Sequence, residues 1–284
     1  MRVLVTGASG QLGYDCVQWL TAHGVTCCGV DREDFDLTDA QAVSTYIRTW
    51  QPDVIIHCGA YTHVDRAETQ PEVCVTVNGV GTLNVVRAAL SVNAKLLYVS
   101  TDYVFSGVQD ESYGVNAQLC PQNVYGVSKT QGEEAVRSLM HRFFIVRTGW
   151  IYSKRGSNIV RQIIREAHGH GEIDAPMDQL GCPTYSADLA ELICKMIATE
   201  RYGVYHAANE GCCSVAELAE ETLRRCGSRC RVRPVETVRR PHEARKPRNL
   251  RLDMQSLDAA GFQRLPDWKD ALGRFLKQAG YEHG

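Results

Sequence analysis

Three residues in the middle of the chain have the types and the spacing needed for proton transfer. Tyr125 and Lys129 lie four residues apart, which places a phenol and an ammonium on one face of a helix. Thr101 lies 24 residues before Tyr125, at the end of a β-branched run. A nearby lysine charge stabilises a phenolate and brings the tyrosine pKa down from about 10 toward the working range. We therefore expect Tyr125 to protonate a developing alkoxide, with Thr101 and Lys129 stabilising charge.

A glycine-rich turn near the N-terminus has the pattern of a dinucleotide site. Gly7, Gly10 and Gly13 lie between a predicted strand and a predicted helix. Without side chains, this backbone can approach a pyrophosphate at the helix N-terminus. Asp31 ends the second predicted strand, 18 residues after Gly13, where an acid that binds the adenosine ribose is expected. The pattern and its context predict NAD(P) binding, and hence hydride transfer to a carbonyl carbon.

The choice between the two nicotinamide cofactors stays open in the sequence. Asp31 favours NADH because its carboxylate repels a 2′-phosphate, whereas Arg32 directly after it could pair with that phosphate. Cofactor contacts are expected from loops at the carboxyl ends of strands and from the catalytic helix. They are predicted at Gly7, Gly10, Gln11, Leu12, Gly13, Asp31, Arg32, Asp36, Leu37, Ala60, Tyr61, Thr62, Tyr125 and Lys129.

Alternating strands and helices must position these residues. Short β-branched runs suggest strands at residues 2–6, 26–30, 54–58, 96–100 and 143–147. Longer amphipathic stretches between them suggest helices at residues 11–23, 39–50, 71–90 and 125–141. Such alternation predicts an α/β fold with a doubly wound parallel sheet of the Rossmann type.

The rhythm of strands and helices becomes less regular after residue 150. Helices are predicted there at residues 157–168, 186–199, 215–226 and 267–279, beside a basic stretch at residues 224–251. We expect residues 1–150 to form the NAD(P)-binding domain, with returning segments after residue 185. Residues 151–284 are expected to form mainly a smaller α/β substrate-binding lobe.

Composition narrows the class of protein. The 284 residues are 44% hydrophobic and carry a formal net charge of −2, so neither nucleic acid nor a membrane surface is an expected partner. No run approaches the roughly 18 consecutive apolar residues of a membrane span, and the start does not resemble a signal peptide. These features predict a cytoplasmic protein. Its twelve cysteines lack C-x-x-C spacing and are expected to be reduced, and no metal site is predicted.

Several segments in order along the chain carry a more specific resemblance. The chain resembles the dTDP-4-dehydrorhamnose reductase family, a branch of the extended short-chain dehydrogenases/reductases. The Thr101–Phe105 segment discriminates best, because related sugar-nucleotide dehydratases usually have an acidic pair after the threonine, whereas Tyr103 follows Asp102 here. The matching segments are residues 6–13, 60–68, 100–107, 124–129, 132–133, 147–150 and 178–184.

The resemblance implies a reaction and a substrate. It implies NAD(P)H-dependent reduction of the 4-keto group of dTDP-4-dehydro-L-rhamnose to dTDP-L-rhamnose, with the hydride from the nicotinamide and the proton from Tyr125. It further implies that Thr101 and Asp102 contact the sugar and that Trp150 packs on the substrate. The family includes monomers and magnesium-linked homodimers, so a monomer or homodimer is expected and magnesium is left open.

The chain departs from the family pattern at several positions, which keeps alternatives open. Lys246 and Leu250 stand where the family has arginine and serine, and lysine cannot make the bidentate phosphate contact of arginine. Gly149 replaces a more usual serine, and Gly59 an alanine. One alternative is a reductase or epimerase of another nucleotide 4-keto-6-deoxy sugar. The other is a non-catalytic subunit resembling the regulatory subunit of methionine adenosyltransferase.

Overall fold

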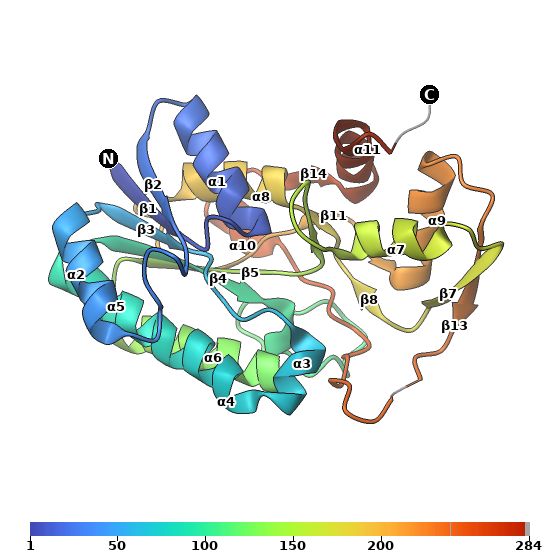
Figure 1. Cartoon of the computed structure of the whole chain (residues 1–284), viewed down its shortest axis with the longest axis horizontal. Coiled ribbons are helices and arrows are strands. Elements are labelled where there is room, and N and C mark those ends of the chain that lie inside the picture. The colour runs from blue at the N-terminus through green and yellow to red at the C-terminus, as the bar shows by residue number, and fades with distance from the viewer. Residues whose placement is uncertain (239, 282–284) are drawn as a thin grey trace.

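A six-stranded sheet forms the centre of the molecule (Figure 1). The computed structural model describes residues 1–238 and 240–281. The strand order is β10-β5-β4-β3-β1-β2, and every neighbouring pair is parallel. This confirms the predicted doubly wound parallel sheet. Its strands are β1 (Arg2–Thr6), β2 (Thr26–Val30), β3 (Val54–His57), β4 (Lys95–Thr101), β5 (Phe143–Thr148) and β10 (Gly203–His206).

Helices cover both faces of this sheet. On β1, Val3 and Val5 belong to one buried cluster and Leu4 belongs to another, because successive side chains of a strand point to opposite faces. The first cluster is closed by α1 (Gln11–Ala22) and α8 (Ser186–Met196), and the second by α2 (Ala40–Trp50), α5 (Gly81–Ser91) and α6 (Val124–Leu139). Both α8 and β10 come from beyond residue 185, so a late segment of the chain completes the sheet.

A smaller group of elements packs around its own buried cluster. That cluster includes Ile163, Leu218 and Phe275, one from each of α7 (Ile159–Ala167), α9 (Val215–Arg225) and α11 (Trp268–Ala279). A parallel pair, β7 (Glu172–Pro176) and β13 (Arg231–Val235), lies against α9. The division at residue 150 stays a prediction, and residues 239 and 282–284 of its second part lie outside the described residues. The remaining elements are η2 (Asp102–Val104), β6 (Ile151–Tyr152), β8 (Leu180–Gly181), β9 (Thr184–Tyr185), β11 (Asn209–Glu210), β12 (Cys213–Ser214), β14 (Leu265–Asp267) and α10 (Gln255–Ala259).

The helix predicted at residues 71–90 contains a π-helical turn. Its parts are α4 (Pro71–Val75), η1 (Thr76–Val80) and α5, preceded by the short helix α3 (Val64–Thr69) that the periodicity does not predict. Such turns often occur at functional sites. Here the turn holds Asn78, which is buried.

The helical run Pro71–Ser91 is long and apolar enough to cross a membrane by length and composition alone, with a mean hydropathy of 1.4. The run is nevertheless interrupted by Glu72, Asn78, Asn84 and Arg87, so it is not a stretch of about 18 consecutive apolar residues, as the sequence-based expectation states. Half of the run is buried inside the fold. Val85, Val86 and Ala89 are fully buried in the core. The packing of a core helix accounts for these apolar residues.

One disulfide joins Cys182 to Cys212, which contradicts the prediction that all twelve cysteines are reduced. Their Cα atoms lie 4.4 Å apart, within the range that a disulfide spans, although 30 residues separate them in sequence. Cys182 follows β8, and Cys212 precedes β12, which pairs with β8. This short antiparallel pairing brings the two cysteines together.

Candidate active site

The end of β4 and the start of α6 bring Thr101 and Tyr125 together. The Thr101 hydroxyl lies near enough to act on the pKa of Tyr125, and Tyr125 is partly exposed. Burial raises the pKa of Tyr125, Thr101 opposes this rise, and the nearby charge of Asp102 adds to it. The prediction of a lowered tyrosine pKa is therefore wrong for this structure. A phenol with a raised pKa stays protonated at neutral pH and is ready to act as an acid.

Lys129 lies one helical turn beyond Tyr125 and is buried. Its Nζ donates a 2.7 Å hydrogen bond to the Val99 carbonyl oxygen and lies 4.1 Å from the centre of the Tyr98 ring. Burial lowers the pKa of Lys129 to about 7, against the opposing effect of the Glu133 carboxylate. The lysine is thus anchored to β4 by its ammonium group.

The first turn of α6 is fixed by two side chains that the sequence analysis does not single out. Asn123 Oδ1 accepts a 2.8 Å hydrogen bond from the Gly126 N–H and so caps the helix. Glu68 Oε1 accepts a 2.8 Å hydrogen bond from the Val124 N–H. Carboxylates near a helix N-terminus are favoured by the helix dipole. Asn123 and Glu68 therefore set where Tyr125 lies.

Asp102 lies directly behind Thr101 and is 1% exposed. Its Oδ1 accepts a 3.0 Å hydrogen bond from Thr101 Oγ1, and its Oδ2 has no hydrogen-bond partner among the described residues. Burial raises the pKa of Asp102 to about 7. The contact of this side chain with a sugar stays a prediction.

Trp150 follows β5 and lies beside Gly181, within the family-matching segment of residues 178–184. A Cβ placed on Gly181 would lie 2.6 Å from a Trp150 ring atom, so the glycine leaves room for the indole. The Thr184 N–H donates a 3.2 Å hydrogen bond to the Trp150 carbonyl oxygen. Trp150 is partly exposed.

The glycine loop forms a cradle that fits a pyrophosphate. Gly7 has φ +68°, and a Cβ on it would lie 2.7 Å from the Gly59 nitrogen. A Cβ on Gly13 would collide with the Gly7 carbonyl oxygen. Gly10 is the N-cap residue of α1 and provides no side-chain cap. The buried Gln11 Oε1 lacks a hydrogen-bond partner within the described part of the chain. Uncapped N–H groups at a helix N-terminus suit an anion, so these residues fit the predicted dinucleotide. Leu12, beside Gln11, is buried in the core.

Asp31 lies beside this loop as a charged carboxylate. Its Oδ2 accepts hydrogen bonds from the Ser9 N–H (3.0 Å) and hydroxyl (2.5 Å), and its Oδ1 accepts one from the Arg32 N–H (2.8 Å). Burial acts to raise its pKa, but these hydrogen bonds outweigh burial and lower it. The Arg32 side chain is exposed, 3.7 Å from the Asp36 carboxylate. Acid and base are thus both available at the ribose end.

Most of the other predicted cofactor residues lie in the loop after β3, which hydrogen bonds connect to the catalytic helix. Leu37 lies 3.0 Å from where a Cβ on Gly59 would be. The Tyr61 N–H donates a 2.7 Å hydrogen bond to Asn78 Oδ1, and Asn78 Nδ2 donates one of 2.8 Å to Ser128 Oγ. The buried amide of the π-helical turn therefore ties the loop to the catalytic helix. The same loop contains Ala60, which is partly exposed, and Thr62, which is exposed.

A buried ion pair supports the site from within. Arg147 on β5 donates two hydrogen bonds to Glu133 on α6, at 2.8 and 2.7 Å, and both side chains are 1% exposed. Ser100 Oγ donates a further 2.6 Å hydrogen bond to Glu133 Oε1. Glu133 lies one helical turn beyond Lys129. The pair therefore joins the catalytic helix to β5, the strand before Trp150.

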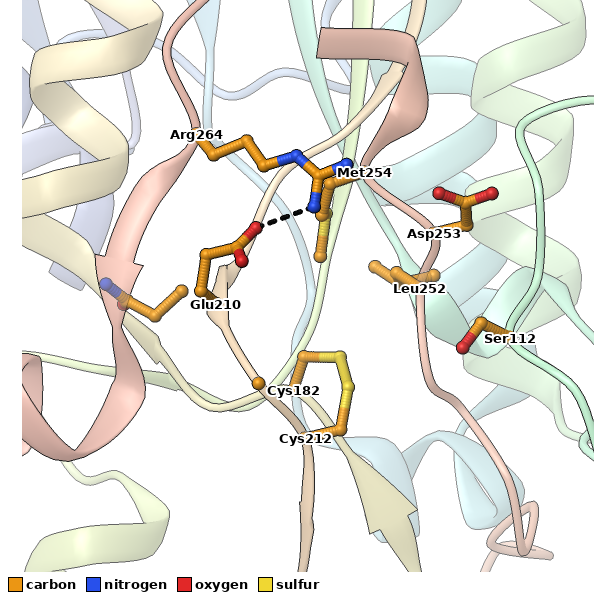
Figure 2. A pocket seen from close by; sticks show the side chains of 10 residues that line it. Ser112, Cys182, Glu210, Cys212, Leu252, Asp253, Met254 and Arg264 are labelled. Atoms are coloured by element: carbon orange, nitrogen blue, oxygen red, sulfur yellow. Dashed lines mark hydrogen bonds and ion pairs between the residues drawn. A yellow bond between two sulfur atoms is a disulfide. The ribbon is translucent and has the colours of Figure 1, made fainter. Parts of the chain in front are cut away.

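A separate cavity of about 350 Å³ lies on another part of the molecule (Figure 2). The Cys182–Cys212 disulfide borders it, and Glu210 and Arg264 form an ion pair of 2.9 Å across it. None of the predicted site residues lines this cavity. Its walls are Ser112, Cys182, Asn209, Glu210, Gly211, Cys212, Leu252, Asp253, Met254 and Arg264.

Comparisons with known proteins agree on one family. The family model described as RmlD substrate binding domain matches residues 1–280. A dTDP-4-dehydrorhamnose reductase of Mycolicibacterium smegmatis is 38% identical over 95% of this chain and 84% of its own. A dTDP-4-keto-6-deoxy-D-glucose reductase of Streptomyces niveus is 34% identical over 95% of both chains. The crystal structure of a Bacillus anthracis dTDP-4-dehydrorhamnose reductase in complex with NADP is 39% identical, covers 98% of both chains and has a TM-score of 0.93.

Proposed function

The chain belongs to the dTDP-4-dehydrorhamnose reductase family, and we propose that it uses NAD(P)H to reduce the 4-keto group of dTDP-4-dehydro-L-rhamnose to dTDP-L-rhamnose. The observation that carries this proposal is the placement of Thr101 and Tyr125 at one sheet edge, with Lys129 one turn behind. A glycine cradle that fits a dinucleotide begins at the same edge of the sheet. The Bacillus anthracis relative with bound NADP supports the cofactor class.

The residues of this chain divide the work of the reaction. The nicotinamide, when bound, supplies a hydride to the carbonyl carbon. Tyr125 donates its phenolic proton to the carbonyl oxygen, and the Thr101 hydroxyl stabilises the charge that develops there. Lys129 contributes positive charge from behind Tyr125 when protonated. Trp150 packs against the sugar nucleotide and excludes water from one side of it.

Turnover of the keto sugar tests this proposal. We expect the protein to oxidise NADPH or NADH when enzymatically generated dTDP-4-dehydro-L-rhamnose is added, with dTDP-L-rhamnose identified as product by NMR. The matched control is dTDP-glucose, which has no keto group to reduce and should leave the absorbance at 340 nm unchanged. Protein that binds dinucleotide but turns over no keto sugar with either cofactor would contradict the assignment and favour the non-catalytic alternative.

A different keto sugar is the second candidate substrate. It is favoured by the Streptomyces niveus relative and by the two departures in the C-terminal segment. Lys246 Nζ lies 3.8 Å from Asp65, and Leu250 is buried, so neither residue offers the contacts of the usual arginine and serine. A comparison of kcat/KM for dTDP-4-dehydro-L-rhamnose and dTDP-4-keto-6-deoxy-D-glucose separates the two. An epimerase would convert substrate with no net loss of reduced cofactor.

Replacing Arg32 with alanine tests the cofactor preference. We expect the variant to bind NADPH about 5- to 10-fold more weakly while NADH binding changes little, because a solvent-exposed guanidinium contributes a modest charge-assisted contact to a 2′-phosphate. Fluorescence titration with each cofactor measures both affinities. Arg48→Ala, an exposed arginine on α2, is the matched control. Equal losses for NADPH and NADH would argue against a phosphate contact at Arg32.

The location of the protein, its partner and the roles of the two parts of the chain complete the proposal. We place the protein in the cytoplasm, with a dTDP-sugar as its small-molecule partner. We also propose that residues 1–150 with β10 and α8 bind the cofactor and that the α7, α9 and α11 lobe binds the nucleotide sugar. No group of three or more His, Cys, Asp or Glu within residues 1–238 and 240–281 is arranged to hold a metal ion. Light scattering decides between a monomer and a homodimer.

A further inference from the structure

A buried carboxyl group behind the catalytic hydroxyl has a free oxygen. Asp102 is 1% exposed, and its Oδ2 makes no hydrogen bond within the described residues. An ionised carboxylate in such a position carries a large desolvation cost unless it is paired. Among the residues that the structure describes, no cation lowers the pKa of Asp102. These features favour a carboxyl group that exchanges a proton rather than a permanent charge.

Thr101 connects this carboxyl group to the catalytic phenol. Its Oγ1 donates a 3.0 Å hydrogen bond to Asp102 Oδ1 and accepts one of 3.2 Å from the Tyr103 N–H. The same hydroxyl lies near enough to Tyr125 to act on the pKa of its phenol. A hydroxyl can accept one proton while it donates another. We propose that Asp102 stores the proton that restores Tyr125 after each reduction, and that Thr101 passes it on. This inference rests on the proposed reductase function.

The proton balance closes over one cycle. When the alcohol forms, the Tyr125 O–H bond breaks and its proton joins the former carbonyl oxygen, which leaves a phenolate. Thr101 then gives its hydroxyl proton to Tyr125 and takes the carboxyl proton of Asp102. Asp102 becomes a carboxylate and recovers a proton from water when the site opens. The net requirement is one solvent proton for each ketone reduced.

Gly149 gives the carboxyl group of Asp102 its room. A Cβ at position 149 would collide with Asp102 Oδ2, so a larger residue there would force this carboxyl group to move. The glycine at position 149 thus allows Asp102 Oδ2 to lie where it does.

The titratable groups that interact with Asp102 are two tyrosines. Tyr103 follows Asp102 directly, and Tyr125 lies near it on α6. The charge of Asp102 raises the pKa of both tyrosines. Burial raises the pKa of Asp102 to about 7, while hydrogen bonds from Thr101 and from backbone N–H groups oppose this rise. The acid form thus dominates below neutral pH and is lost as pH rises. The neighbouring cation Lys129 is coupled instead to Glu133, Cys58 and Cys74.

Rapid-mixing kinetics of Asp102→Asn test the relay. Tyr125 begins each experiment protonated, so we expect a normal first turnover, seen as a burst of one equivalent of cofactor oxidised per site. Later turnovers should be about 10-fold slower, a loss at or below the lower end of acid–base effects. The wild-type kcat should fall as pH rises through about 7, where both Asp102 and Lys129 lose a proton. The decline should be smaller in the variant, because only the part due to Lys129 is left. A direct sugar contact would instead slow the first turnover or raise KM.

Two controls keep the relay test open to failure. Asp53→Asn, an exposed carboxyl group in the loop before β3, should reproduce the wild-type pH profile. Loss of the burst, or an unchanged pH decline in Asp102→Asn, would overturn the relay. Wild-type protein that turns over no keto sugar would instead remove the proposed function.

A titration of the wild-type protein is independent of how the variant folds. With ¹³C-labelled aspartate, one carboxyl resonance should titrate near pH 7, far above the usual aspartate value of about 3.9. The titration is followed by NMR without substrate. It requires neither turnover nor a variant. If every aspartate titrates below about 5, Asp102 holds no proton to pass on at neutral pH, and the relay is wrong.

Discussion

Phenylalanine at position 125 will lower kcat by about two to four orders of magnitude, the range that a positioned general acid contributes. Tyr125 is the phenol near Thr101 at the end of β4, and phenylalanine keeps the ring while removing the proton. NADPH binding should stay close to wild type, because the glycine cradle is untouched. Steady-state kinetics with dTDP-4-dehydro-L-rhamnose and a fluorescence titration of NADPH measure the two effects separately.

Tyr103→Phe is the matched control for that substitution. The Tyr103 ring meets the Tyr125 ring edge to face, with 5.9 Å between centroids, so both variants remove a hydroxyl from the same aromatic pair. We expect Tyr103→Phe to retain kcat within a few-fold of wild type. If Tyr125→Phe turned over the keto sugar at the wild-type rate, the proton would have to come from another group.

The elements that bear the site could be predicted from local patterns. The strands at residues 2–6 and 26–30 agree with β1 and β2 to the residue, because each is a short β-branched run bounded by turns. Asp39 caps α2 as its type and position indicate. The helix predicted from residue 157 begins at Ile159 instead, because Asn158 rather than Ser157 supplies the cap. Asn and Ser are nearly equal as caps, so sequence alone does not choose between them.

Features set by tertiary packing could not be predicted. Asn78 stands in an apolar helical stretch, and only the π-helical turn reveals that its amide joins the Tyr61 loop to Ser128. The spacing of Cys182 and Cys212 gives no sign of their pairing, which depends on where β8 and β12 meet. Both contacts are long-range, and local periodicity carries no information about them.

The direction of the Tyr125 pKa shift has the same origin. The spacing of Tyr125 and Lys129 correctly predicts that both lie on one helix, and from it a lowered tyrosine pKa was expected. The structure buries Lys129 against the Val99 carbonyl oxygen and raises the tyrosine pKa by desolvation. Burial is a property of the whole fold, so the sequence indicates the residue types of the site better than their proton affinities.

Replacing Glu133 with glutamine will destabilise the protein by about 3–5 kcal/mol, because it leaves the Arg147 guanidinium buried without its counter-charge. Both side chains are 1% exposed, and the pair is bidentate. Urea unfolding followed by circular dichroism measures the change. Arg137→Gln is the matched control: it removes the exposed partner of the same carboxylate, 3.4 Å away, and should cost at most about 1 kcal/mol.

The pH dependence of stability gives an independent check on this pair. Burial acts to raise the pKa of Glu133, but hydrogen bonds and charge from Arg147 outweigh it and lower the pKa below its unfolded value. The stabilisation is therefore complete above the unfolded pKa of about 4.3 and is lost as pH falls through the lower folded value. Glu133→Gln should lack this part of the acid destabilisation. If Glu133→Gln lost as much stability at acid pH as the wild type, Glu133 would not be the ionised partner.

A double replacement separates the cost of leaving one charge buried alone from the net contribution of the ion pair to the free energy of unfolding. Glu133→Leu with Arg147→Met removes both charges, so no charge is left buried alone, and replacing buried ion pairs by apolar residues is often neutral. We expect the double variant to be more stable than Glu133→Gln, with a strongly non-additive cycle. The ion pair joins α6 to β5. We therefore expect the double variant to have a lower kcat even if its free energy of unfolding equals that of the wild type. A stable double variant with full activity would show that packing alone positions Tyr125.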